Sequence, residues 1–306
     1  MTDVITRADE KTQAPVTPPR GGAKDRWVRR APLLPALVFA LIVTQVPFLF
    51  TLYFSTQGWN ALRPGSRHWV GLSNYKTVLT DDRLRSALLN TVVLTAGAVI
   101  FSMILGLLLA ILLDRKFFGR SIVRTLMITP FLIMPVAAAL LWKHGIFNPD
   151  YGLINGVFGG NTAWATSYPK TTIITTLVWQ WTPFMMLAFF AGRQAMPLGP
   201  YRAAAVDGAN AFQTFFRLTL PLMTPLLVVI GMLRFIDAFK VFDSVFILTA
   251  GGPAVSTESP SMLAYKMTFE QWRIGESAAM AVVVWVAFFV VCNVFYQVAK
   301  KRLKAF

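Results

Sequence analysis

Long apolar stretches separated by short polar segments make up almost the whole of this chain. A helix needs about 20 mostly apolar residues to cross a hydrocarbon core that is roughly 30 Å thick. Six stretches meet this requirement, and they cover residues 31–54, 88–113, 123–142, 171–192, 221–242 and 277–299. The pattern therefore predicts an all-α membrane protein with six transmembrane helices.

The fifth stretch differs from the others because charged residues interrupt it. Only 16 uncharged residues separate Arg217 from Arg234, which is about 24 Å of helix at 1.5 Å per residue. To span the membrane, the helix must start near Pro221 and continue to about Phe242. Arg234, Asp237 and Lys240 then lie at membrane depth, where charges are costly and usually face a bundle interior or a cavity.

Polar segments mark the remaining parts of the chain. Residues 151–169 and 244–257 are uncharged but rich in small polar residues, Gly and Pro, so we expect loops there. Residues 1–28 are polar and rich in Pro, Gly and Thr, and they predict a disordered cytoplasmic tail. The transmembrane domain then covers residues 29–306, and its first apolar stretch is too long for a signal peptide and predicts an uncleaved helix.

The distribution of Lys and Arg orients the six predicted helices. An even number of spans places both termini on one side of the membrane. If that side is the cytoplasm, the inner segments hold 18 basic residues and the longer outer segments hold 10. This agrees with the excess of Lys and Arg in cytoplasmic loops. The N- and C-termini are therefore expected in the cytoplasm, and the net charge of +15 does not require a nucleic-acid partner.

Composition narrows the class of protein further. The chain is 55% hydrophobic and 14% charged, whereas soluble domains carry about 25% charged residues, so the composition argues against a cytosolic globular protein. The single cysteine, Cys292, is expected to be a small buried residue of the last helix. His68 and His144 fall outside the spans, and the phosphate-loop pattern G-x-x-x-x-G-K-[ST] is absent from the sequence. We therefore expect neither an enzyme nor a bound metal or cofactor in this chain.

The cytoplasmic segment 193–220 is the most informative polar stretch. Pro200 suits the first turn of a helix, the alanines at 203–205 favour helix, and Gly208 can close it in a left-handed cap. A second short helix over residues 211–220 would lead to Pro221. The segment predicts a small helix-turn-helix, and its small side chains would let another protein approach closely. An amphipathic interfacial loop without a partner is the alternative that spacing alone leaves open.

This segment resembles the EAA loop of ATP-binding-cassette (ABC) importer permeases, which reads E-A-A-x-x-D-G-A followed by an aromatic-rich stretch ending in L-P. The matching residues are Ala203, Ala204, Asp207, Gly208, Ala209, Phe215, Leu220 and Pro221. The resemblance implies a coupling helix that docks on an ATPase subunit. Its candidate coupling residues are Tyr201, Arg202, Ala203, Ala204, Ala205, Asp207, Gly208 and Ala209.

Two residues of the segment depart from the resembled pattern. Arg202 stands at the position where Glu is expected, and Arg193 stands where Leu is usual. The reversed charge at Arg202 requires either a compensating acidic residue on the ATPase or a reorganised contact.

Further motifs narrow the resemblance to one subfamily. The run F-K-V-F-D at 239–243 and the run L-T-A-G-G-P at 248–253 look like the F-x-x-F-D and L-T-x-G-G-P signature of carbohydrate-uptake permeases. Residues 71–75, 152–155 and 179–184 also fit permeases similar to the first subunits of the maltose and glycerol-3-phosphate systems. The resemblance covers roughly residues 30–306 and implies the type I ABC importer (MetI-like) permease fold.

The fourth and fifth helices supply candidate contacts for a sugar. Sugar hydroxyls need donors and acceptors, and the apolar face of a pyranose packs on aromatic rings. The resemblance places substrate contacts on these two helices. The candidate pathway residues are Trp181, Phe184, Asp237, Lys240, Val241 and Asp243. The alternative is a purely structural ion-pair network, in which Arg234 pairs with Asp237 and Lys240 pairs with Asp237 or Asp243.

The resemblance implies a permease subunit of a bacterial inner-membrane importer that takes up a carbohydrate or carbohydrate derivative by alternating access. Its expected partners are a second permease subunit, two ATPase subunits that bind ATP and Mg²⁺, an external solute-binding protein and membrane lipid. The rival hypothesis is an ion-coupled secondary transporter that uses Asp237 and Asp243 as ion sites. A membrane scaffold without a transport role is a weaker third alternative.

Overall fold

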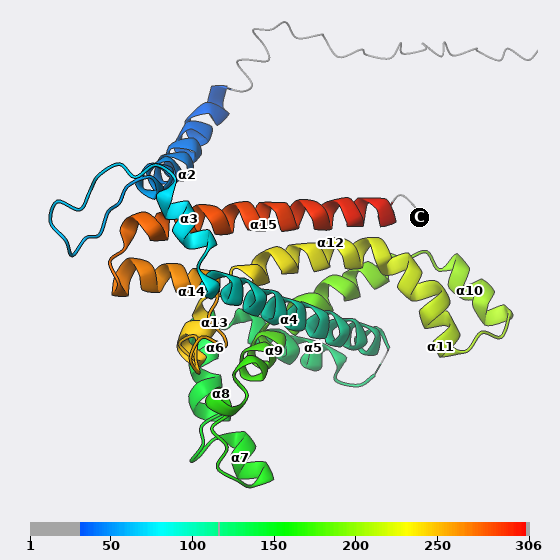
Figure 1. Ribbon diagram of the computed structural model, residues 1–306. Coiled ribbons are helices and arrows are strands. Elements are labelled where there is room, and N and C mark those ends of the chain that lie inside the picture. Colours follow the sequence, from blue (N-terminus) through cyan, green and yellow to red (C-terminus); the bar gives the residue numbers. More distant parts are fainter. Residues whose placement is uncertain (1–30, 116, 304–306) are drawn as a thin grey trace, which may run out of the picture. The chain divides into compact units, whose positions relative to one another are not determined.

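The computed structural model describes residues 31–115 and 117–303, and the backbone of these residues is mostly helical (Figure 1). Apart from an isolated bridge between Gln57 and Trp69, the described part of the chain contains no β-structure. The predicted tail at residues 1–28 lies outside the described residues. Backbone contacts divide the chain into two units, residues 1–50 and 51–306.

The helix predicted at 31–54 is found. A short 3₁₀ turn at Ala31–Leu33 leads into α2 (Leu34–Ser55), and together they form an apolar helix of 25 residues. At 1.5 Å per residue this helix is about 37 Å long, which is enough to cross the hydrocarbon core. The helix runs through the boundary between the two units.

Helices α4 (Asp82–Asp114) and α9 (Pro169–Gln194) pack along each other and form the centre of the second unit. Gly106 permits their close approach, because a Cβ at this position would lie 2.4 Å from Met185 Cβ. Buried Met185, Met186 and Phe189 fill the interface beside it. Helices α5 (Arg120–Leu132) and α12 (Leu220–Phe239) pack against this pair.

The third predicted span, residues 123–142, is broken rather than straight. Helix α5 ends at Leu132, α6 (Pro135–Leu140) follows with a π-helical turn at Leu141–Ile146, and the two halves meet at 97°. Ile133 and Met134 are extended, with ψ of 132° and 141°. The cause is Pro135, which disfavours the helical conformation in the residue before it. The described residues thus contain five continuous candidate spans, or six with this bent pair.

The fifth span is longer than predicted at its start and shorter at its end. Helix α11 (Ala211–Thr214) and a π-helical turn at Phe215–Thr219 continue directly into α12, giving one apolar helix over Ala211–Phe239. The short helix predicted at 211–220 is found, but no break separates it from the fifth span. The wide π turn accommodates Pro221, which has no amide hydrogen to donate. The helix ends at Phe239, three residues before the predicted end at Phe242.

The remaining elements complete the second unit. The two predicted loops are partly helical, with α7 (Leu153–Phe158) and α8 (Trp164–Ser167) in the first and α13 (Asp243–Leu248) in the second. Helix α3 (Ser73–Leu79) precedes α4, and α14 (Pro260–Tyr265) precedes α15 (Ile274–Leu303), the sixth span. Figure 1 shows α10 (Gly199–Val206) and α11 at one end of α12, and α13 and α14 at the other.

Replacing Gly106 with Ala is expected to destabilise the protein, because the added methyl group would force α4 and α9 apart. Overpacking of this kind costs about 1–3 kcal/mol. Gly156→Ala is the matched control, since Gly156 lies in α7 and a Cβ there meets no atom within 4 Å. Thermal unfolding of the purified protein in detergent should give a lower melting temperature for Gly106→Ala only. Equal shifts for both variants would show that the α4–α9 contact is not tight at Gly106.

Candidate functional site

A cavity of about 150 Å³ lies where α9, α12 and α13 meet. Five of the six predicted pathway residues line it, namely Trp181, Asp237, Lys240, Val241 and Asp243. Its other lining residues are Pro135, Leu177, Gln180, Arg234, Ala238, Phe242 and Ser244. The structure therefore brings the predicted residues together around one space, while their role in transport stays a prediction.

Arg234 is the most deeply buried charge in this cavity, with only 2% of its surface exposed. Its Nη1 donates a hydrogen bond of 2.7 Å to Asp237 Oδ2, so the predicted pair between these residues is found. Its guanidinium carbon lies 4.1 Å from the centre of the Trp181 ring. The carboxylate and the electron-rich ring face together offset the cost of burying the cation.

Two residues that line the cavity also carry buried polar atoms without a hydrogen-bond partner. Arg234 Nε and Nη2 and Gln180 Oε1 are buried and have no partner among the described residues. The amide of Gln180 is held in place because its Nε2 donates to the carbonyl oxygen of Ile133 at 3.0 Å. Buried polar groups without a partner are rare in folded proteins, so these atoms mark the wall of the cavity as unusual.

Lys240 and Asp243 border the cavity where the backbone leaves the helical conformation. Lys240 caps the end of α12, and Asp243 lies in the first turn of α13. Both are exposed, and across residues 31–115 and 117–303 no ion pair joins Lys240 to Asp237 or Asp243. The predicted ion-pair network is therefore limited to Arg234 and Asp237, which leaves the charges of Lys240 and Asp243 facing open space.

Phe184 does not line the cavity. Its ring packs against those of Phe131 and Trp181 instead. Phe131 of α5 lies between the two predicted aromatic residues, with ring centres 5.5 Å from Trp181 and 5.6 Å from Phe184. Sequence analysis missed Phe131, because the contact depends on how α5 packs against α9. Its only signal in the sequence is its position next to Pro130 in an apolar span.

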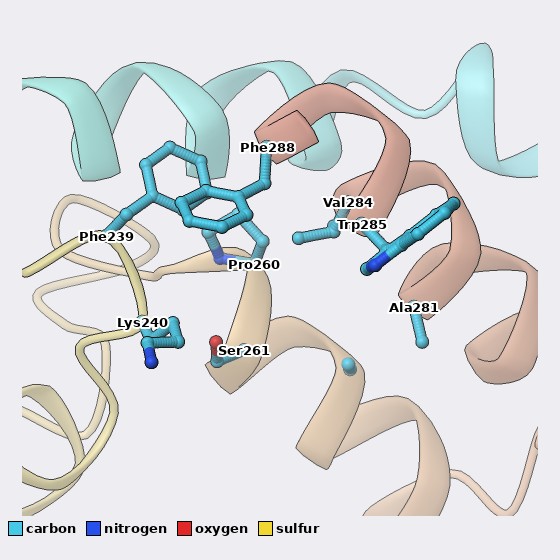
Figure 2. A pocket seen from close by; sticks show the side chains of 9 residues that line it. Phe239, Lys240, Pro260, Ser261, Ala281, Val284, Trp285 and Phe288 are labelled. Atoms are coloured by element: carbon cyan, nitrogen blue, oxygen red, sulfur yellow. The ribbon is translucent and has the colours of Figure 1, made fainter. Parts of the chain in front are cut away.

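A second and more apolar cavity of about 370 Å³ lies between the end of α12, α14 and α15 (Figure 2). The rings of Phe239 and Phe288 meet at 5.0 Å on one side of it, and Trp285 lies on another. Lys240, Ser261 and the indole nitrogen of Trp285 supply polar side-chain atoms around it. Lys240 lines both cavities and therefore lies between the polar space and the apolar one.

Glu258 anchors the loop that carries the L-T-A-G-G-P run. Its side chain is 1% exposed and accepts hydrogen bonds from Arg83 Nη2 at 3.0 and 3.1 Å and from Lys266 Nζ at 2.9 Å. The next residue, Ser259, donates from its hydroxyl to the carbonyl oxygen of Val241 at 3.1 Å. The loop is thus tied to α4, to the turn that follows α14 and to the cavity wall. Sequence analysis missed Glu258, although it is the only acidic residue between Asp243 and Glu270.

The predicted coupling segment forms the predicted helix. Helix α10 covers Gly199–Val206, and Gly208 follows with a φ of +69°, the left-handed conformation expected for its cap. Asn210 and Gln213 form a capping box that starts α11. The candidate coupling residues Arg202, Ala203, Ala205, Asp207 and Gly208 are exposed, whereas Tyr201, Ala204 and Ala209 are half-buried.

Exposed apolar side chains accompany these coupling residues. Val206 is 89% exposed, and Leu198 and Phe212 are exposed on either side of it. Sequence analysis did not single out these three residues. Exposed apolar groups on a polar segment are typical of a contact surface.

Comparison with known proteins gives a consistent result. Residues 98–305 match the family described as "Binding-protein-dependent transport system inner membrane component". A probable ABC transporter permease protein of Sinorhizobium fredii is 34% identical, over 87% of this chain and 90% of that protein. The trehalose transport system permease protein SugA of Mycobacterium tuberculosis is 33% identical, over 86% of this chain and 85% of that protein.

A solved structure shares the fold. It is described as a bacterial alginate ABC transporter in complex with an alginate pentasaccharide-bound periplasmic protein. The similarity covers 91% of this chain and 96% of the matched chain, with a TM-score of 0.79 and 21% sequence identity. The fold described above is therefore that of a type I ABC importer permease.

Proposed function

The chain belongs to the family of binding-protein-dependent transport system inner membrane components, and we propose that it is a permease subunit of an ATP-driven importer of a carbohydrate or carbohydrate derivative. One observation carries this proposal. A single helix, Ala211–Phe239, begins at the exposed coupling segment and ends at the polar cavity. The relative named for trehalose transport supports the carbohydrate class.

The proposed complex contains a second permease subunit, two ATPase subunits and an external solute-binding protein. ATP and Mg²⁺ are bound by the ATPase subunits, and this chain performs no covalent chemistry. Its N- and C-termini face the cytoplasm, as the distribution of Lys and Arg indicates. The exposed apolar side chains of α4 and α15 suit contact with lipid or with the second permease subunit.

The proposed mechanism is alternating access. Closure of the ATPase subunits displaces α10, and the helix Ala211–Phe239 carries this movement to the cavity. There a sugar packs its apolar face on Trp181, and its hydroxyls accept from Lys240 and donate to the accessible carboxylates of Asp237 and Asp243. The cavity-lining cations, Arg234 and Lys240, balance the carboxylates of Asp237 and Asp243, so a neutral sugar needs no counter-ion.

The ion-coupled alternative has weaker support in the geometry. The carboxylate of Asp237 already accepts a hydrogen bond from Arg234, and Asp243 is exposed at the start of α13. An ion site needs several oxygen ligands around one point. Among the described residues, no three Asp, Glu, His or Cys side chains are grouped to hold a metal ion.

Uptake by the reconstituted complex tests the proposed function. Proteoliposomes that contain the complex, with ATP inside and the solute-binding protein outside, should accumulate at least one of trehalose, maltose or sn-glycerol 3-phosphate. Uptake should require ATP and the binding protein and should persist when ion gradients are abolished. Uptake by this chain alone, driven by an ion gradient without ATP, would overturn the proposal.

Replacing Gly208 with Val is expected to disturb coupling through the backbone. A Cβ at Gly208 meets no atom within 4 Å, but its φ of +69° is costly for a β-branched residue. Asn tolerates this conformation and is the matched control. Co-purification of the ATPase and ATP-driven uptake should fall for Gly208→Val and be largely kept for Gly208→Asn, with both variants still inserted in the membrane. Full function of Gly208→Val would show that the left-handed turn is dispensable for coupling.

Replacing Trp181 with Ala is expected to lower uptake by about 5- to 30-fold, because the aromatic platform and its cation–π contact with Arg234 are lost. Trp179→Ala is the matched control, since Trp179 is equally half-buried on the same helix but does not line the cavity. Uptake rates should be normalised to the amount of inserted complex. Similar losses for both variants would mean that Trp181 acts only in packing, and Trp181→Phe should restore part of the rate.

A further inference from the structure

Side chains, rather than backbone packing, attach α10 to the transmembrane helices. The backbone of α10 approaches other elements closely at very few points. Most of its side chains are exposed, and Tyr201 is one of its few half-buried residues. The position of α10 therefore depends on what Tyr201 contacts.

Tyr201 takes part in a cluster that we call the Arg193 cluster, formed by Asp114, Arg193, Tyr201 and Thr219. The Arg193 guanidinium carbon lies 4.3 Å from the centre of the Tyr201 ring. Arg193 Nε lies 3.4 Å from Asp114 Oδ2. The Tyr201 hydroxyl donates to Thr219 Oγ1 at 3.2 Å.

Each member of the Arg193 cluster belongs to a different element. Asp114 is the last residue of α4, and Arg193 lies in the last turn of α9. Tyr201 lies in α10, and Thr219 ends the π-helical turn that enters α12. Four side chains thus join α10 to the cytoplasmic ends of three predicted spans.

We propose that Arg193 is a positioning residue that fixes the orientation of α10, so that movement of the ATPase is passed to the transmembrane helices rather than absorbed by the loop. This inference rests on the proposed function. Arginine suits the position because its planar guanidinium can stack on Tyr201 while it pairs with Asp114. The side chains of Arg193 and Asp114 are 22% and 32% exposed, so solvent screens their attraction less than it would on an open surface.

The proposal also divides the coupling residues into two groups. Tyr201 faces the chain's own helices and acts in positioning. Its neighbour Arg202 is exposed and forms no ion pair within the described residues. Arg202 and exposed Val206 therefore belong to the surface that meets the ATPase. Arg193, which departs from the usual Leu, and Arg202, which departs from the usual Glu, serve different purposes.

The coupling ratio of the reconstituted transporter tests the proposal. The measured quantity is the number of sugar molecules imported per ATP hydrolysed, using whichever of trehalose, maltose or sn-glycerol 3-phosphate the wild-type complex transports. Arg193→Leu should lower this ratio at least about fivefold, while the ATPase still co-purifies and hydrolyses ATP. Arg193→Lys keeps the charge but loses the planar stack, and it should give an intermediate ratio.

Arg115→Leu is the matched control, because Arg115 is an exposed arginine next to Asp114. Its ratio should equal that of the wild type. An unchanged ratio for Arg193→Leu would overturn the proposal, since a merely structural residue would lower the amount of folded complex but not the ratio. If Arg193→Leu does not insert in the membrane, Tyr201→Leu replaces it, with the same expected fall and the same contradicting result.

The same measurements separate this inference from the proposed function. Failure of the wild-type complex to couple uptake to ATP would refute the proposed function. Coupled uptake by the wild type together with an unchanged ratio in Arg193→Leu would refute only the role of Arg193.

Discussion

Two breaks in the predicted membrane spans determine where polar side chains can lie within them. The first is at Ile133 and Met134, and the second follows Phe239. A membrane interior offers no water to backbone groups, so irregular backbone survives there only where the protein itself supplies partners or lines a cavity. At the first break, Gln180 donates to the carbonyl oxygen of Ile133. At the second, Ser259 donates to the carbonyl oxygen of Val241. Both breaks border the same cavity, and the residues that satisfy the freed carbonyl groups also hold its walls in place.

The sequence was sufficient to predict the apolar spans, the helix α10 and the left-handed turn at Gly208, because charge gaps, alanine runs and a glycine cap act locally. The pair between Arg234 and Asp237 was also predictable, since residues three apart on a helix are neighbours. The bend between α5 and α6 was not predicted, although Pro135 was visible. Apolar length measures how a segment partitions into a membrane and does not report its curvature.

The contacts that required tertiary structure involve residues distant in sequence. Trp181 meets Arg234 and Phe131 because α5, α9 and α12 converge, and no periodicity along the chain encodes that meeting. Glu258 appears in the sequence only as an isolated acid in an apolar region. Its two basic partners, Arg83 and Lys266, come from opposite sides of the sequence. The sequence showed that Arg193 stands where Leu is usual. Only the structure shows that its guanidinium stacks on Tyr201.

Helix α4 connects two ion pairs, one at each of its ends. Its 33 residues contain no proline and extend about 50 Å. Arg83 binds Glu258 at one end, and Asp114 pairs with Arg193 at the other. In the proposed transporter, this uninterrupted helix is a candidate route between the two sites at its ends. If a partner at one end changes binding at the other, the reciprocal effect has the same magnitude.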